Sequence, residues 1–220
     1  MKIVLSNNSC RGFTFVDFII VFVIVLLFVG FLAMPKTRGL KTPASRINCV
    51  SNLKQVGLAF RIWANEHDHE FPMTVSSTQT GSLEYIETSE TYRHFQLMSN
   101  ELVSPKILVC SADRKRTRAT NFDSFNNRNL SYFVGVDADE SKPDMVLSGD
   151  RNITGAARTN GHLFVFSRNS AVGWSKALHK SAGNVGLSDG SVQQVTAANL
   201  DRLFKLNTND LIRLSVPMAE

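Results

Sequence analysis

The chain of 220 residues has few long hydrophobic runs. It contains one uncharged apolar block, Phe18–Met34, and no second block of this kind. A membrane protein with several spans is therefore excluded. Compositional bias is also lacking, since 43% hydrophobic, 20% charged and 9% aromatic residues exclude disordered, collagen-like and low-complexity classes. The length allows one folded domain plus an appendage.

An excess of charge is missing as well. The net charge is only +5, too weak an excess to indicate a nucleic-acid partner. The basic run Arg114–Arg118 has no aromatic platform beside it, and we interpret it as an exposed loop. The cluster His67–Glu70 lacks a C-x-x-C or H-E-x-x-H frame, so a solvated helix exit is favoured over a metal site.

The apolar block is the appendage. A helix over 13–34 has 22 residues and rises about 33 Å, enough for a hydrocarbon core of roughly 30 Å. The alternative is a secretory signal peptide, but the run is longer than the usual apolar region and Ala33-Met34-Pro35 is a poor cleavage site. We therefore predict a retained transmembrane helix at 13–34.

Asp17 is the only acid in this apolar stretch. An acid at mid-membrane costs about 2.5–3.5 kcal/mol, so Asp17 is expected to have a partner or a function. The alternative is an interfacial carboxylate that stays hydrated.

The run Gly12-Phe13-Thr14-Phe15-Val16-Asp17-Phe18 resembles the prepilin processing motif G-F-T-L-V-E-L of type IV pilins and type II secretion pseudopilins. The resemblance implies a leader at 1–12 that prepilin peptidase removes between Gly12 and Phe13, with N-methylation of Phe13. It also implies that Asp17 meets the Phe13 ammonium of a neighbouring subunit. The sequence departs from the motif at Asp17, which replaces Glu, and at Phe15 and Phe18, which replace Leu.

The same resemblance sets the expected location. It implies a single-pass protein of the bacterial inner membrane in contact with lipid, with its N-terminus in the cytoplasm and its head in the periplasm or in an extracellular filament.

A head domain is predicted at 45–220, after a kink or linker at 35–44 that contains Pro35, Gly39 and Pro43. A helix over 45–66 follows, and its apolar residues recur at three- and four-residue steps: Ile47, Val50, Leu53, Val56, Phe60 and Trp63.

A β-rich region at 131–195 and a closing helix at 196–206 complete the head. Its short, β-branched segments are bounded by Gly, Asn, Asp or Ser, and lie at 131–136, 145–148, 162–166, 184–187 and 191–195. The last two flank Ser188-Asp189-Gly190, a hairpin signal. We predict an α+β, pilin-like fold with a long N-terminal helix, transmembrane and then amphipathic, packed on a small antiparallel sheet.

The head resembles a pilin-like family with a C-x-x-N-L-K-Q-I-G-x-A helix and a C-terminal H-x9-D-G signature. Here these are the run Cys49–Ala59 and His179 followed by Asp189-Gly190. We expect His179 to hydrogen-bond backbone near the Asp189-Gly190 turn and fix the hairpin. An acid–base or metal pair of His179 with Asp189 is the alternative. We assign neither a G-x-S-x-G motif nor a paired nucleophile that would support a hydrolase, and we predict no enzymatic activity.

Cys49 and Cys110 remain once the leader has taken Cys10 with it. An oxidised head then suggests one disulfide, and two unpaired buried thiols are the alternative. No cofactor is expected. Major pseudopilins often carry a calcium loop, and Asp137, Asp139, Glu140 and Asp144 lie in one loop here, with Asp189 in another. Because this spacing does not match an EF-hand, a solvated acidic loop is favoured over calcium.

The predicted function is a pseudopilin-like subunit that polymerises with other pilin-like subunits through its N-terminal helix. The alternative is a membrane-anchored binding module that uses the pilin segment only for export and anchoring.

Overall fold

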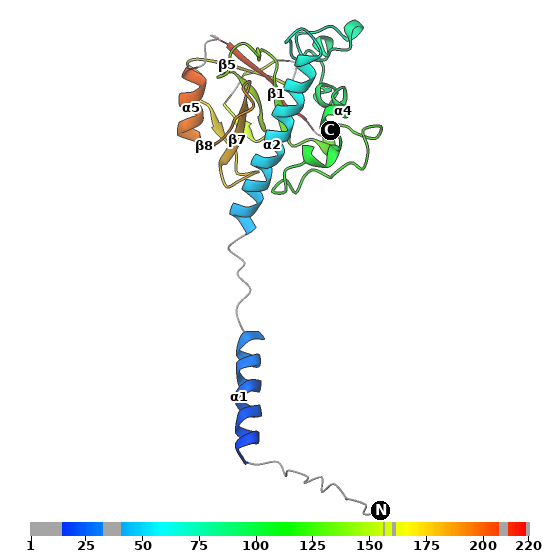
Figure 1. The fold of residues 1–220 in the computed structure, drawn as a ribbon. Coiled ribbons are helices and arrows are strands. Elements are labelled where there is room, and N and C mark those ends of the chain that lie inside the picture. Colours follow the sequence, from blue (N-terminus) through cyan, green and yellow to red (C-terminus); the bar gives the residue numbers. More distant parts are fainter. Residues whose placement is uncertain (1–14, 33–40, 156, 160–161, 207–210, 219–220) are drawn as a thin grey trace, which may run out of the picture. The chain divides into compact units, whose positions relative to one another are not determined.

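The computed structural model describes residues 15–32, 41–155, 157–159, 162–206 and 211–218 (Figure 1). They fall into two units. The first contributes helix α1 (Phe15–Leu32), and the second begins at Lys41.

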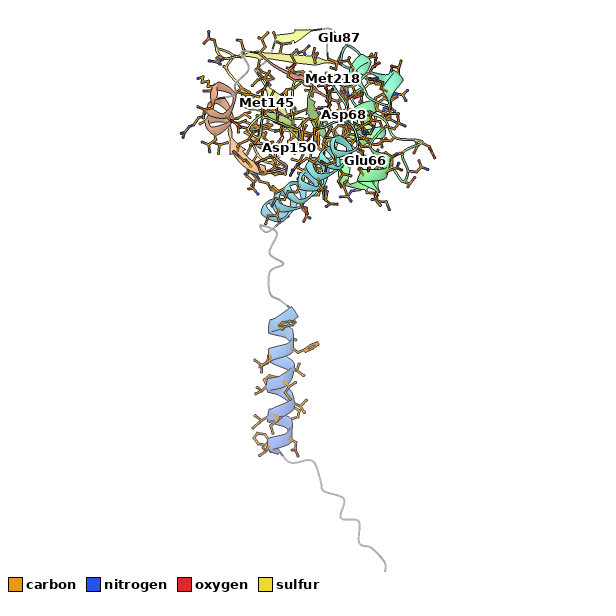
Figure 2. All side chains as sticks on the ribbon, turned by 45° about the horizontal axis from the view of Figure 1, so that its top comes forward. Glu66, Asp68, Glu87, Met145, Asp150 and Met218 are labelled. Atoms are coloured by element: carbon orange, nitrogen blue, oxygen red, sulfur yellow. A yellow bond between two sulfur atoms is a disulfide. The ribbon has the colours of Figure 1, made fainter. Side chains whose placement is uncertain are left out.

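Helix α1 carries apolar side chains along its length (Figure 2). Most of them are exposed, including Phe15 at 78%, Leu27 at 70% and Phe31 at 68%. Asp17 lies in its first turn, where a negative charge is favourable for the helix dipole. The predicted membrane span is wrong: no helix in the described part of the chain combines the length and apolarity needed to cross a bilayer. The 18 residues of α1 rise about 27 Å, less than a hydrocarbon core of roughly 30 Å.

Two further features of the predicted pilin-like fold need correction: the linker before the second helix and the size of the sheet. A second helix, α2 (Lys41–Asn65), starts inside the segment 35–44 that was predicted as a linker. The sheet is not small, because it has seven strands and is accompanied by a two-stranded sheet.

The remaining elements of the second unit follow α2 along the chain. The helices are α3 (Arg93–Gln96), α4 (Ser99–Leu102) and α5 (Ala197–Leu206), with 3₁₀ turns η2 (Ser77–Gln79), η3 (Leu83–Tyr85), η4 (Pro105–Leu108) and η5 (Asn127–Asn129). The strands are β1 (Tyr132–Gly135), β2 (Val146–Asp150), β3 (Ile153–Thr154), β4 (Ala157–Thr159), β5 (Leu163–Ser167), β6 (Gly173–Trp174), β7 (Ala182–Leu187), β8 (Val192–Thr196) and β9 (Leu211–Ser215).

The large sheet has the strand order β4-β5-β9-β1-β2-β7-β8, and all neighbouring strands are antiparallel. Each of the five predicted strand segments overlaps one of its strands. Strand β9 was not predicted, yet it lies between β5 and β1. Its Leu214 is opposite Phe164 on one side and Gly135 on the other.

Both faces of this sheet are covered. Alternate residues of β1 enter different cores: Tyr132 and Val134 join the core that includes α2, whereas Phe133 joins the core that includes α5. All four residues of β1 are buried for this reason.

Helix α2 buries a stripe with three- and four-residue spacing: Cys49, Leu53, Val56, Phe60 and Trp63. Phe60 packs edge-to-face on Phe71 and Phe95, with ring centroids 6.0 and 5.9 Å away. Ile47, predicted as part of the stripe, is 62% exposed because the core covers the helix only from Cys49 onward.

Candidate functional site

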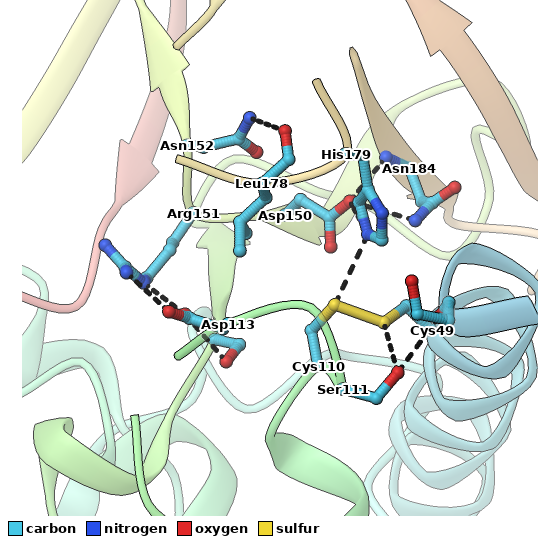
Figure 3. The surroundings of a disulfide bond; sticks show 12 residues. Cys49, Cys110, Ser111, Asp113, Asp150, Arg151, Asn152, Leu178, His179 and Asn184 are labelled. Atoms are coloured by element: carbon cyan, nitrogen blue, oxygen red, sulfur yellow. Dashed lines mark hydrogen bonds and ion pairs between the residues drawn. A yellow bond between two sulfur atoms is a disulfide. The ribbon is translucent and has the colours of Figure 1, made fainter. Parts of the chain in front are cut away.

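A cluster of buried polar and sulfur-containing side chains lies where α2, the segment after η4, the end of β2 and the start of β7 meet (Figure 3). The predicted disulfide between Cys49 and Cys110 is present, with Cα atoms 5.2 Å apart. Both cysteines are fully buried. The bond ties α2 to the segment that follows η4.

His179 points into this cluster. Its Nε2 lies 3.3 Å from Cys110 Sγ and 3.4 Å from Asp150 Oδ2 (Figure 3). Burial, and secondarily the charge of Arg46, lowers the pKa of His179 to about 4. The imidazole is therefore neutral at pH 7, and its contact with Asp150 is not a charged pair.

The backbone at His179 is strained. His179, Lys180 and Ser181 have φ values of 47°, 56° and 64°, so three successive non-glycine residues adopt the left-handed conformation. Each costs roughly 1–2 kcal/mol relative to right-handed backbone. Strain of this kind persists where the surroundings enforce it, and it is common at functional sites.

Asp150 is fully buried at the end of β2. Burial raises its pKa to about 7, although its Oδ2 accepts hydrogen bonds from the Asn184 backbone N–H at 2.8 Å and from Asn184 Nδ2 at 2.9 Å. Its other oxygen, Oδ1, is buried with no hydrogen-bond partner in the described part of the chain.

A buried ion pair adjoins the cluster. Arg151 donates from Nε and Nη2 to the two oxygens of Asp113, at 2.6 and 2.8 Å. Ser131 Oγ donates to the same carboxylate at 3.0 Å. Burial opposes ionisation of Asp113, but these bonds and the Arg151 charge outweigh it, so its pKa lies below the usual value.

The two ends of the H-x9-D-G signature are separated in space, and the expectation that His179 fixes the Asp189-Gly190 turn is wrong. Strand β7 lies between them, and its six residues extend about 20 Å. The turn is held instead by the Asp189 carboxylate, which accepts from the Ser191 N–H at 2.8 Å, and by Gly190 at φ 83°.

Helix α2 contacts both β7 and the Asp189-Gly190 turn. Arg46 Nη2 donates to Gly183 O at 3.2 Å, and Arg61 Nη1 donates to Asp189 O at 3.1 Å. Gly57 lies against Gly190, since a Cβ built on Gly57 would be 3.3 Å from the Gly190 Cα. These contacts fix the position of α2 along the β7–β8 hairpin.

The prediction that the chain has no G-x-S-x-G motif is wrong, because the pentapeptide Gly186–Gly190 fits this pattern of hydrolases. In that pattern the serine is exposed on a strand-to-helix turn. Here the segment joins β7 to β8, and Ser188 is fully buried with its Oγ 3.4 Å from Met145 O. Ser188 is not placed as a nucleophile.

Four of the five candidate calcium ligands, all except Asp144, are held by separate groups of the protein. Asp137 binds Arg213, Asp139 binds Ser141 and Lys142, and Glu140 binds His69 and Arg61. Asp189 lies at the hairpin turn.

Two histidines of the cluster His67–Glu70, His67 and His69, also have protein partners. His67 stacks on Trp63 with ring centroids 3.6 Å apart, and His69 contacts Glu140 at 3.0 Å. The basic run is not a uniformly exposed loop, because Arg116 is buried and donates to Leu130 O and Pro217 O.

Gly12 and Phe13 lie outside the described residues, so the predicted processing junction has no structural account. Asp150, Arg151 and Asn184 were not singled out from the sequence. A usable signal was the pair Asp150-Arg151, because it brings two charged residues to the end of the strand predicted from residue 145 onward.

No protein-family model, no curated protein and no solved structure matches this chain.

Proposed function

We propose that the chain is a pseudopilin-like subunit that prepilin peptidase cleaves between Gly12 and Phe13 and that assembles with other copies through its N-terminal apolar helix. The observation that carries the proposal is the surface of α1. Its side chains from Phe15 to Phe31 are apolar except Asp17, and they are exposed in the isolated chain. A helix that is hydrophobic all round requires a cover.

The sequence favours burial of the apolar α1 surface against α1 helices of other copies of the chain. The prepilin-like motif Gly12–Phe18 runs directly into α1 and supplies the acid that pairs with the processed terminus of a neighbour. Such a pair makes two desolvated charges tolerable. The filament would form at the bacterial inner membrane.

The disulfide supports a location outside the cytoplasm for the second unit. Structural disulfides form and persist in oxidising compartments and are rare in the cytosol. The proposed subunit therefore keeps α1 for assembly and presents the unit from Lys41 onward to the periplasm or the cell surface.

Disulfide crosslinking in intact cells tests this proposal. Val21→Cys in α1 is expected to give a ladder of covalent oligomers on non-reducing gels. Gln55→Cys, on the exposed face of α2, is the matched control and is expected to give far fewer. Isolated monomers for both variants would contradict assembly and favour the anchored binding module.

N-terminal sequencing tests processing separately. The mature chain is expected to begin at N-methylated Phe13, and retention of Met1 in native protein would contradict cleavage.

A further inference from the structure

Cys49, Cys110 and His179 form the only group of three or more potential metal ligands found in the described ranges of the chain. One ligand atom from each lies within 4.8 Å of the others, and all three residues are buried. Asp150 extends the group, because its Oδ2 is 3.4 Å from the same His179 Nε2 that faces Cys110 (Figure 3).

We propose that, when the disulfide is reduced, these residues form a tetrahedral site for one thiophilic divalent ion such as Zn²⁺. The ligands are Cys49 Sγ, Cys110 Sγ, His179 Nε2 and the Asp150 carboxylate. Two thiolates, one imidazole and one carboxylate are all common zinc ligands. This inference does not depend on the proposed function.

The ligand spacing fits such an ion. Zn–S bonds of about 2.3 Å and Zn–N or Zn–O bonds of about 2.0–2.2 Å place tetrahedral ligands roughly 3.3–3.8 Å apart. Nε2 is 3.3 Å from Cys110 Sγ and 3.4 Å from Asp150 Oδ2. The two sulfurs must separate, and side-chain rotation on backbones whose Cα atoms are 5.2 Å apart allows this.

The surroundings suit a charged centre. Asn184 holds Asp150 Oδ2 through two hydrogen bonds and leaves Oδ1 without a hydrogen-bond partner in the described part of the chain. An ion of charge +2 with three anionic ligands carries −1. Arg46, which acts electrostatically on both Asp150 and His179, supplies a compensating positive charge.

The two states exclude each other, because the disulfide uses both sulfur ligands. A dithiol reductant transfers two electrons and two protons to the sulfurs, which cleaves the Cys49–Cys110 bond and forms a disulfide in the reductant. Metal binding then displaces the two thiol protons. Exposed Ser111, whose Oγ is 3.9 Å from Cys49 Sγ, marks the short route from solvent.

Cobalt(II) titration of the full-length protein in detergent tests the site. The chain is reduced with a phosphine, freed of reductant without oxygen and titrated with Co²⁺ alone. Reduced wild type is expected to bind one ion per chain with a thiolate-to-cobalt charge-transfer band that Zn²⁺ abolishes, and the oxidised form is expected to show no such band.

Variants identify the ligands. His179→Ala is expected to weaken Co²⁺ binding by more than about 100-fold, and the near-isosteric Asp150→Asn by about 10–100-fold. His94→Ala is the matched control, because His94 is also fully buried but contacts Ser82 away from the cluster. The His94→Ala variant should bind the same number of Co²⁺ ions per chain and show the same charge-transfer band as wild type.

Near-UV circular dichroism of each sample separates loss of ligand from loss of fold. The proposal is overturned if folded, reduced wild type gives no charge-transfer band or if His179→Ala binds Co²⁺ as tightly as wild type. It is also overturned if reduced wild type unfolds both with and without the metal.

Discussion

Gly57 of α2 and Gly190 of the β7–β8 turn lie against each other: a side chain at Gly57 would begin 3.3 Å from the Gly190 Cα and 3.6 Å from its carbonyl oxygen. Two glycines from distant parts of the chain thus allow the helix to approach the hairpin turn closely. Arg61, one turn along the same helix, donates to the adjacent Asp189 carbonyl.

Gly57→Leu is therefore expected to destabilise the second unit by about 1–3 kcal/mol, because the new side chain meets turn backbone that has little room to move. The midpoint of urea unfolding measures this loss. Gln55→Leu, on the exposed face of the same helix, serves as the control. Equal midpoints for the two variants would contradict the close approach.

Loss of the disulfide is expected to cost about 4 kcal/mol by the chain-entropy relation, since Cys49 and Cys110 are 61 residues apart. Cys49→Ser, Cys110→Ser and the double variant should unfold at the same urea concentration when a metal chelator is present. Reduced wild type should match them. A double variant markedly less stable than either single one would show that the cysteines act independently.

Asp113→Asn is expected to destabilise the second unit by about 3–5 kcal/mol, because it leaves Arg151 with an unpaired, largely buried charge. The control is Asp139→Asn, whose partner Lys142 is half-exposed, and its cost should not exceed about 1 kcal/mol. If both variants lost the same free energy of unfolding in urea, burial of the Asp113–Arg151 pair would not increase its contribution to stability.

Stability should depend on pH through Asp150. Burial raises the pKa of Asp150 to about 7 from 3.8, so between these values the folded chain keeps a proton that the unfolded chain has released. Its stabilising contribution is therefore full at low pH and falls as the pH rises to about 7. His179, whose pKa burial lowers to about 4, contributes in the opposite direction between about 4 and 6.5.

Asp150→Asn isolates the first effect, because it removes the carboxyl and keeps His179. The unfolding free energy of wild type minus that of the variant should be largest near pH 4 and decrease toward pH 7. Urea unfolding at a series of pH values gives this difference. A difference that grows with pH would contradict the raised pKa.

Local patterns predicted much of the second unit. The spacing of Leu53, Val56, Phe60 and Trp63 located α2, because helix periodicity and burial coincide there. The Ser188-Asp189-Gly190 signal located the hairpin, since its geometry is set by adjacent residues.

What failed depends on distant parts of the chain. Strand β9 was missed because Leu211–Ser215 gains its place only by pairing with β5 and β1. The position of His179 was misjudged because a fixed spacing from Asp189 was taken as proximity, although an extended strand separates its ends. Arg116 looked solvated because its buried carbonyl acceptors, Leu130 and Pro217, are far from the basic run.

The insertion of β9 also orders events during synthesis. Strands β5 and β1 face each other only across β9, so on a growing chain they remain separate until residue 215 has been made. Assembly of the complete sheet therefore waits for residue 215, and the preceding polypeptide has no finished core until then.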